Sequence, residues 1–381
     1  MPIKKLDTGN YRVTASLGFD PITGKHRRKY ISNVKTKAEA EQIYADLKSK
    51  YTNNELPTLN KISFRELSRM YFSDYTLNQK PTYIRTQEGY AKNHLIPFFK
   101  NTNITKITST EIRQFQKKLI KKKTLSNNSI NKHLILLKKI FDVAIEKKYI
   151  VTNPCINIKK LKVEKQKMKF WTLSEFKTFI KAVEDDYLKT KDEQPEKFVF
   201  IVFYYTQYLT GLRAGESTAL LWEDNTFEKQ EFDINKTESR IHGKVVTTSP
   251  KTKSGIRHVS YNAKYKDILI QWKEIQNNIL NSYGIEVTPQ THIFQYSDKI
   301  PDRDNFSTKK INKICTSTDI TAIRLHDFRH SHVALLIDNK EELTAIKERM
   351  GHASITTTID TYGHLFPNKQ KSMSDKIDEL F

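Results

Sequence analysis

Residues 325–332 read Leu-His-Asp-Phe-Arg-His-Ser-His, which places one arginine among three histidines in a short stretch. Two more stretches stand out in this half of the chain. Leu-Thr-Gly-Leu-Arg-Ala-Gly-Glu lies earlier, at 209–216, and Met-Gly-His lies later, at 350–352, followed ten residues later by Tyr362. Taken alone, each stretch is weak evidence for a site. Arg213 and Glu216, for example, could form the common helix ion pair between residues three apart. The combination of the three stretches decides how this half of the chain is interpreted.

Together, the three stretches predict a site for a phosphate group. Arg213 and Arg329 could each hold two phosphate oxygens, because the guanidinium is planar and stays charged. The Tyr362 hydroxyl is a candidate nucleophile, and it needs nearby cations or a base because free tyrosine has a pKa of about 10. A lysine of the turn at 250–257, Pro-Lys-Thr-Lys-Ser-Gly-Ile-Arg, could protonate the leaving oxygen.

A metal site is the competing interpretation of the histidines. No glutamate lies between two of them as in H-E-x-x-H, and each lies beside an arginine or in a turn, which disfavours a metal. A Walker-type phosphate-binding pattern is also missing, which argues against an ATP-driven enzyme. We therefore expect neither a metal nor a cofactor. The histidines concerned are His326, His330, His332, His352 and His364.

The combined pattern T-G-x-R-x-x-E, H-x-x-R-H, G-H and a C-terminal tyrosine, in this order, resembles the tyrosine recombinases, or phage integrase family. The resemblance covers nearly the whole chain and is greatest to integrases of temperate phages and integrative elements of low-GC Gram-positive bacteria. It implies a multidomain, mainly α-helical fold. The expected parts are a small β-sheet-plus-helix arm-type DNA-binding domain at 1–55, a helical core-binding (SAM-like) domain at 60–158, and a mostly helical catalytic domain with a small antiparallel β insert at 168–381.

The resemblance also implies a role for each matching residue of the catalytic domain. Arg213 and Arg329 match the two arginines that clamp the scissile phosphate, and His352 matches its third contact. His326 matches the residue that assists proton transfer to or from the nucleophile. Tyr362 matches the nucleophile that forms a 3′-phosphotyrosine.

The general acid and the supporting residues follow from the same resemblance. Lys251 matches the general-acid lysine of the β-hairpin, and Lys253, two residues later, remains an alternative. Glu216 would support the first arginine without touching DNA. His330 and His332 would hold the catalytic side chains in position without contacting the phosphate.

Positive charge is concentrated in one part of the chain. The formal net charge is +22, and residues 61–170 contain 25 lysines and arginines against 7 acidic residues. Residues 171–381 contain 29 against 30, and residues 1–60 contain 11 against 6. A basic block beside a neutral one indicates a surface for nucleic acid, because cations near phosphates release counterions. The alternatives are a lysine-rich surface kept for solubility, or AT-rich codon bias.

The N-terminal region reads as a small sheet followed by one helix. Residues 10–34 alternate as strands around a Pro/Gly turn, and a capping box at Thr36–Glu39 opens the helix. Arg27, Arg28 and Lys29 lie on or beside a strand, and a two-stranded ribbon fits the major groove of DNA. The alternative is a packing module with solvated charges.

The next region, residues 62–150, reads as a helical bundle whose polar faces are almost all lysine. Lys121, Lys122 and Lys123 lead into a helix start, where backbone N–H groups could meet phosphate. Capping boxes at 63–66 and at 108–111 mark two of its helices, and the apolar stripes of these helices are plain core.

Three further segments complete the predicted organisation. Residues 157–170 carry six lysines with little apolar pattern, which indicates a basic linker. A capping box at 172–175 opens the third domain, in which a strand-rich insert spans roughly 231–261. We hypothesise that the C-terminal tail, residues 372–381, docks on a neighbouring protomer.

Composition excludes several other classes of protein. Cys155 and Cys315 are the two cysteines and lie far apart, which argues against a disulfide scaffold and a thiolate zinc site. The longest apolar run, residues 198–205, is far short of the ~18 residues of a membrane span. The first residues also lack the apolar core of a signal peptide. We expect a cytoplasmic protein acting on chromosomal or element DNA in a bacterial host cell.

The predicted function is a site-specific recombinase that cuts and rejoins double-stranded DNA at core and arm attachment sites, to integrate or excise a phage or mobile element. The resemblance implies a homotetramer on synapsed DNA, with a host bending factor and an excisionase as further partners. Two alternatives stay open: a topoisomerase IB-like enzyme that nicks and reseals, and a non-catalytic DNA-binding regulator.

Overall fold

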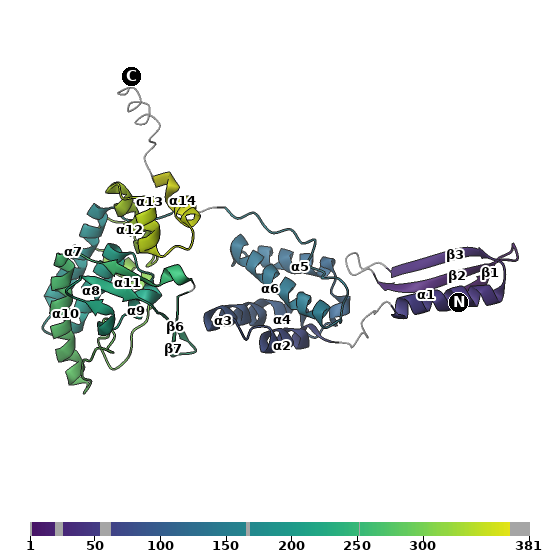
Figure 1. Cartoon of the computed structure of the whole chain (residues 1–381), viewed down its shortest axis with the longest axis horizontal. Coiled ribbons are helices and arrows are strands. Elements are labelled where there is room, and N and C mark those ends of the chain that lie inside the picture. The colour runs from purple at the N-terminus through teal and green to yellow at the C-terminus, as the bar shows by residue number, and fades with distance from the viewer. Residues whose placement is uncertain (1, 20–25, 54–61, 165–167, 251, 366–381) are drawn as a thin grey trace, which may run out of the picture. The chain divides into compact units, whose positions relative to one another are not determined.

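The computed structural model forms two compact units, residues 1–165 and residues 166–381, and each is described by itself (Figure 1). The predictions made for Lys251 and for the tail at 372–381 lie outside the described residues. The described residues are 2–19, 26–53, 62–164, 168–250 and 252–365.

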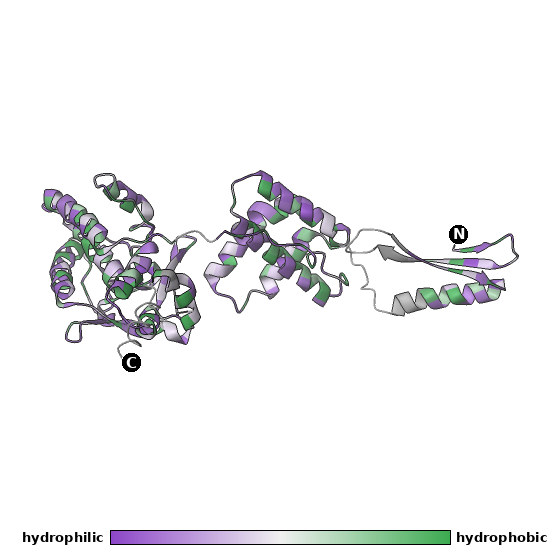
Figure 2. Cartoon of the chain, turned by 90° about the horizontal axis from the view of Figure 1, so that it is seen from above, coloured by the Kyte–Doolittle hydropathy of each residue, from purple (hydrophilic) through white to green (hydrophobic). Residues whose placement is uncertain are grey.

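The first unit begins with an antiparallel sheet in the order β1-β2-β3, followed by one helix. Val13 of β2 pairs with Ile3 of β1 and with Ile31 of β3, so the apolar residues gather on one face of the sheet. Helix α1 contributes Ala40 to the same small core, and Figure 2 shows apolar and polar residues alternating along it. The elements are β1 (Ile3–Lys5), β2 (Tyr11–Phe19), β3 (His26–Val34) and α1 (Lys37–Asn53).

The helical bundle follows in the same unit, and its predicted capping boxes are confirmed. Ser63 and Glu66 cap α2, and Thr108 and Glu111 cap α5, each with reciprocal hydrogen bonds between side chain and backbone. One turn is a π-helix, η1, which connects α3 to α4. The elements are α2 (Phe64–Asp74), α3 (Pro81–Tyr90), η1 (Ala91–Leu95), α4 (Ile96–Phe99), η2 (Ile104–Lys106), α5 (Ser109–Lys121) and α6 (Asn127–Glu146).

Side chains of the helical bundle form hydrogen bonds to the backbone of the segment that follows it. Asn131 of α6 both donates to the carbonyl oxygen of Leu161 and accepts from its N–H. Gln116 of α5 donates to the carbonyl oxygen of Lys159. The first part of the segment read as a basic linker therefore packs on the helical bundle.

The second unit is built around α8, a helix that is apolar on nearly all sides and almost entirely buried. Phe179 of α7 and Phe328 of α12 (Asp327–Asp338) pack against Tyr204 of this helix. A helix without a polar face is stable only at the centre of a domain, which explains its position. The helices up to the last motif are α7 (Leu173–Thr190), η3 (Pro195–Lys197), α8 (Phe198–Thr210), α9 (Ala214–Thr218), η4 (Trp222–Asp224), α10 (Ala263–Ser282) and α11 (Thr308–Cys315).

The strand-rich insert forms two small antiparallel sheets, β4-β5-β8 and the hairpin β6-β7. The hairpin turns at His242 and Gly243, which have φ of 50° and 79°. Two central residues with positive φ are typical of the type I′ turn, whose twist suits a hairpin. The strands and the following turn are β4 (Asn225–Thr226), β5 (Glu231–Ile234), β6 (Thr237–Ile241), β7 (Lys244–Thr248), η5 (Lys253–Gly255) and β8 (Arg257–Ser260).

The last helices carry the second and third motif stretches in chain order, residues 325–332 and 350–362; the first is residues 209–216. Val333 and Ile337 of α12, Ile346 and Met350 of α13, and Tyr362 of α14 form one apolar cluster. These elements are α12 (Asp327–Asp338), α13 (Leu343–Met350), α14 (Ile355–Tyr362) and η6 (Gly363–Leu365).

The predicted fold class is confirmed: the chain is multidomain and mainly helical, with a sheet-plus-helix module at the N-terminus and small antiparallel sheets in the second unit. None of the described helices combines the length and apolar character needed to cross a membrane. In the described part of the chain, no three His, Cys, Asp or Glu side chains are grouped to hold a metal ion.

Candidate active site

The three motif stretches, distant in sequence, meet in the second unit. Nη1 of Arg329 donates to the carbonyl oxygen of Gly211 at 2.9 Å, which joins α12 to the first motif. Nη2 of Arg329 lies 3.0 Å from Nε2 of His352, in the third motif. The hydroxyl of Tyr362 lies 2.8 Å from Nδ1 of His330. We call this group the arginine–histidine cluster, and its members are Arg213, His326, Arg329, His330, His352 and Tyr362.

Arg213 precedes α9, where a buried carboxylate holds its guanidinium. Gly211 ends α8 with φ of 64°, a left-handed conformation that favours glycine and turns the chain towards α9. Glu216 accepts from the backbone N–H of Arg213 at 2.9 Å and from its Nη1 at 2.6 Å. The side chain of Glu216 is 3% exposed and that of Arg213 is 42% exposed. The guanidinium is thus fixed at one end and open to solvent at the other.

Arg257 is a second partner of Glu216, and none of the sequence motifs gives it a role. Its Nη2 lies 3.0 Å from Oε2 of Glu216, and its Nε donates to the carbonyl oxygen of Arg349 at 2.7 Å. Burial acts to raise the pKa of Glu216, but Arg257 and Arg213 outweigh burial and lower it. Glu216 therefore stays a carboxylate between two arginines. A lone arginine at a strand start gives no sequence signal of such a role.

Arg329 is almost completely buried, and backbone carbonyls hold it. Besides Gly211, it donates from Nη2 to the carbonyl oxygen of Met350. Neutral carbonyls fix the guanidinium without cancelling its charge, so that charge stays available for an anion. Burial, followed by repulsion from Arg213, lowers the pKa of Arg329 to about 9, and the side chain remains cationic at neutral pH.

The protonation of His352 follows from its partners. Because arginine can only donate, Nε2 of His352 accepts from Arg329, and its Nδ1–H donates to Oγ1 of Thr358 at 2.8 Å. Burial and the charge of Arg329 lower the pKa of His352 to about 4. A bound phosphate would raise that pKa and give Nε2 a proton to donate.

Tyr362 lies at the end of α14 with its side chain buried. Only 2% of the residue is exposed, and burial raises the pKa of its hydroxyl to about 12. Arg329 and Arg213 act in the opposite direction, because a cation favours the phenolate. The hydroxyl is therefore neutral at pH 7, and it would have to lose its proton to act as the nucleophile that the resemblance implies.

The two histidines on either side of Arg329 are placed differently with respect to Tyr362. The ring of His330 lies 5.5 Å from the tyrosine ring, and its Nδ1 contacts the hydroxyl. His326 is exposed and packs edge-on against His330, with ring centroids 5.1 Å apart. The resemblance implies proton transfer by His326, but the histidine in direct contact with the Tyr362 hydroxyl is His330.

His332 connects α12 to the elements that carry the first motif. Its Nδ1 donates to the carbonyl oxygen of Tyr208 at 2.8 Å, and its Nε2 accepts from Nε of Arg349 at 2.9 Å. Arg349 also donates to the carbonyl oxygens of Leu209 and Ser260. Burial, followed by the charge of Arg349, lowers the pKa of His332 to about 3, so it stays neutral.

The two lysines considered for the general acid follow the β6-β7 hairpin. Lys251 lies outside the described residues. Lys253 belongs to the single turn η5 and is exposed. No described contact joins Lys253 to the arginine–histidine cluster, so the choice between the two lysines remains open.

The predicted DNA-binding residues lie in the first unit. Arg28 and Lys29 are exposed on β3, opposite Ser16 and Ala15 of β2. Arg27 belongs to the same strand, but its side chain is not among those described. The three lysines at the end of α5 are all exposed: Lys121, Lys122 and Lys123.

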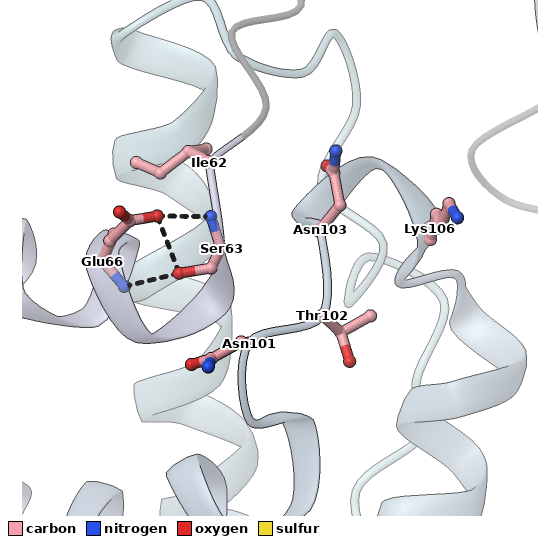
Figure 3. Close-up of a pocket in the computed structure, with 7 residues that line it drawn as sticks. All are labelled: Ile62, Ser63, Glu66, Asn101, Thr102, Asn103 and Lys106. Carbon is pink, nitrogen blue, oxygen red and sulfur yellow. Dashed lines mark hydrogen bonds between the residues drawn. The ribbon is translucent and has the colours of Figure 1, made fainter.

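A cavity of about 500 Å³ also opens in the first unit, beside the start of α2 (Figure 3). The carboxylate of Glu66 points into the helix cap, where it accepts from the backbone N–H and the hydroxyl of Ser63. This carboxylate belongs to the helix cap, and no member of the arginine–histidine cluster lines the cavity. The lining residues are Ile62, Ser63, Glu66, Asn101, Thr102, Asn103 and Lys106.

Three protein-family models match the chain. The model of the phage integrase family matches residues 169–369, which include the whole arginine–histidine cluster. The model of the phage integrase N-terminal SAM-like domain matches residues 63–120. The model of the arm DNA-binding domain matches residues 2–51.

A similar protein and two similar solved structures are also integrases. The chain is 42% identical to the ICEBs1 integrase of Bacillus subtilis (strain 168) over 381 residues, which is the full length of both. A structure of the Tn1549 transposon integrase with a circular intermediate DNA covers 84% of this chain and 100% of that one, at TM-score 0.65 and 17% identity. A lambda integrase tetramer bound to a Holliday junction covers 93% and 96%, at TM-score 0.57 and 14% identity. The two structures show the likeness of the fold.

Proposed function

Because this chain belongs to the phage integrase family and is a site-specific tyrosine recombinase, we propose that Tyr362 is the residue that breaks and rejoins the DNA strand. One observation carries this proposal. Arg329 of α12 is hydrogen-bonded to His352, which follows α13, and its neighbour His330 is hydrogen-bonded to Tyr362 of α14. The charges of Arg329 and Arg213 both act on the Tyr362 hydroxyl. An attacking hydroxyl next to fixed cations is the arrangement that phosphoryl transfer requires.

The two arginines would bind the scissile phosphate from different depths. Arg213 is half-exposed and can meet an incoming phosphate, while Arg329 is held in the protein interior behind it. His352 is hydrogen-bonded to Arg329 and would be the third residue that contacts the phosphate. Donors held rigidly in this way stabilise the charge that develops on the nonbridging oxygens, and little reorganisation is needed during the reaction.

The reaction would proceed in two matching transfers. The oxygen of Tyr362 attacks phosphorus, the bond to the 5′ oxygen breaks, and the phenol proton passes to a base. Lys251 or Lys253 would donate a proton to the leaving 5′ oxygen. A 3′-phosphotyrosine keeps the energy of the phosphodiester bond, so the 5′-OH of a partner strand can attack it without ATP. Neither a metal nor a cofactor has a step in this scheme.

The proposed partners are core and arm attachment sites on double-stranded DNA. Exposed cations on β3 and at the end of α5 support contact with phosphates, and the arm module supports a second DNA site. We further propose a homotetramer on synapsed DNA, as lambda integrase forms on a Holliday junction, with a bending factor and an excisionase as accessory proteins. The reaction would take place on chromosomal or element DNA in the bacterial cytoplasm.

The mobile DNA would be an integrative element or a prophage. The relative that is 42% identical over the full length is the ICEBs1 integrase, and a prophage ps2 probable integrase of Lactococcus lactis is 26% identical over 396 residues. The proposed reaction joins such an element to the host chromosome or releases it.

A suicide substrate, in which the cut strand cannot rejoin, tests the nucleophile. The wild-type chain should become covalently attached to DNA that carries the element's attachment junction, and the Tyr362→Phe variant should bind the same DNA without any adduct. An adduct that persists in the variant would show that another residue attacks. No adduct with the wild-type chain would leave a non-catalytic DNA-binding regulator.

A second measurement separates recombination from simple relaxation. A topoisomerase-like enzyme would reseal the same strand, whereas a recombinase joins strands from two duplexes. Two differently labelled junction duplexes should therefore yield exchanged products. Relaxation of supercoiled DNA without exchange would favour the topoisomerase alternative.

A further inference from the structure

A base, His330, lies next to the proposed nucleophile Tyr362, and the motif gives this histidine only a supporting role. Among the described residues, the hydrogen-bond partner of the Tyr362 hydroxyl is Nδ1 of His330, at 2.8 Å. His330 follows Arg329 directly, so one turn of α12 supplies both a buried cation and the contact to the nucleophile. No contact described in the structure joins His326 to Tyr362, and the His326 ring packs against His330.

The direction of this hydrogen bond follows from acidity. A phenol has a pKa of about 10, whereas a neutral imidazole holds its N–H far more tightly. The stronger arrangement therefore has the Tyr362 hydroxyl donating to Nδ1, with the ring proton of His330 on Nε2. In that tautomer the Nδ1 lone pair is aimed at the proton that must leave during attack.

The surroundings keep His330 neutral. Burial lowers its pKa to about 4, and the neighbouring His326 adds to this effect, while Asp327 opposes it. As the tyrosine oxygen forms its bond to phosphorus, its proton becomes more acidic, which favours transfer of the proton to Nδ1 of His330. The titratable and charged groups around the ring are Arg324, His326, Asp327 and Arg329 near the start of α12, His352 after α13, and Tyr362 of α14.

We propose that Nδ1 of His330 accepts the proton of Tyr362 during strand cleavage and returns it when the strand is rejoined. The inference rests on the proposed function of Tyr362 as nucleophile. The tyrosine oxygen forms its bond to phosphorus, the bond to the 5′ oxygen breaks, and the phenol proton moves to Nδ1, leaving an imidazolium. In rejoining, the 5′-OH attacks, and the imidazolium protonates the departing tyrosine oxygen.

Single-turnover cleavage of a suicide substrate tests this assignment with His330→Asn and the matched variant His326→Asn. Asparagine can keep a hydrogen bond near the position of Nδ1 but cannot take up a proton. We expect His330→Asn to cleave about 10²- to 10³-fold more slowly at pH 7. Its rate should rise about tenfold per pH unit between pH 7 and 9, more steeply than that of the wild type, because only the ionised phenol would attack.

A fluorinated tyrosine at position 362 provides the readout that a structural role would not change. Fluorine makes the phenol more acidic, so less proton transfer is needed. The analogue should bring His330→Asn to within about tenfold of the wild-type chain carrying the same analogue. It should leave any defect of His326→Asn unchanged.

The outcomes separate the inference from the proposed function. A His330→Asn rate within threefold of wild type, or a defect that the fluorinated tyrosine does not relieve, overturns the role of His330. Relief seen in His326→Asn but not in His330→Asn transfers the role to His326. If the wild-type chain forms no adduct at all, the proposed function itself fails. A DNA-binding measurement on each variant confirms that it is folded.

Discussion

At the end of α5, Lys121, Lys122 and Lys123 are exposed, whereas in the second unit, here called the catalytic unit, Arg257 and Arg329 are 7% and 3% exposed. The lysines lie in the region of large positive charge, and the arginines lie in a region with almost none. The difference fits the role that we propose for each group of charges. Holding a DNA backbone needs many interchangeable cations, while stabilising one reacting phosphate needs a few whose positions cannot change.

The strongest way to test this contrast is to remove the cation that faces the phosphate. Arg213→Ala should lower the rate of single-turnover cleavage about 10²- to 10³-fold, because one fixed donor to the developing charge is lost. DNA affinity should change by less than about threefold, since most phosphate contacts are made elsewhere. The matched control is Arg303→Ala, an exposed arginine paired with Asp304 in the same unit, which should cleave normally. A proportional loss of affinity and rate in Arg213→Ala would contradict the division of roles.

Removing the buried carboxylate tests the support behind Arg213. Glu216→Gln keeps the shape of the side chain but leaves Arg257 without its counter-charge, which should reduce the free energy of unfolding by about 3 kcal/mol. Urea denaturation measures this loss. The exposed Glu223→Gln is the control and should change stability by less than about 0.5 kcal/mol. Equal effects of the two variants would show that Glu216 is not the anchor of the cluster.

Acid should destabilise the catalytic unit at pH values at which the exposed lysines keep their charge. His332 has a pKa of about 3 in the folded chain and an ordinary value near 6.5 when unfolded. The unfolded chain therefore binds more protons between these values, so the contribution of His332 is present above pH 6.5 and is lost as pH falls towards 3. Glu216, whose pKa is also lowered, acts in the same direction. Thermal unfolding at a series of pH values should show a falling Tm below about pH 6, and a constant Tm down to pH 4 would contradict it.

The smallest effect per residue is expected at the exposed lysines. Replacing Lys121, Lys122 and Lys123 together by alanine should weaken DNA binding on any sequence, and each residue that contacts phosphate should reduce the salt slope by about one. Cleavage at saturating protein should stay unchanged. Lys264→Ala, an exposed lysine of the catalytic unit, is the control and should leave the slope as it is. An unchanged slope in the triple variant would remove this surface from the DNA contacts.

Local sequence patterns predicted the elements of the first unit well. The capping boxes at Ser63 and Thr108 start helices in the structure because a hydroxyl and a carboxylate three residues apart satisfy the same free N–H groups wherever they occur. The sequence predicts a linker at 157–170 because this segment lacks an apolar period. Its backbone is instead held by polar side chains such as Asn131, and such contacts leave no periodic pattern in the sequence.

The catalytic unit shows where sequence patterns stop being informative. Arg213 and Glu216 could be paired from their spacing, but Arg257 joins them from 41 residues away, on a strand with no motif. In the same way, His326 and His330 are both near Arg329 in sequence, and nothing in that spacing tells which ring meets Tyr362.

The sequence by itself determined the family, the residue types proposed to bind and react with phosphate, and the separation of basic from neutral regions, because these depend on composition and local order. Only the tertiary structure decided which carboxylate restrains which arginine and which imidazole contacts the tyrosine hydroxyl. Those pairings depend on distances of about 3 Å between segments that are remote along the chain, and such distances arise from packing.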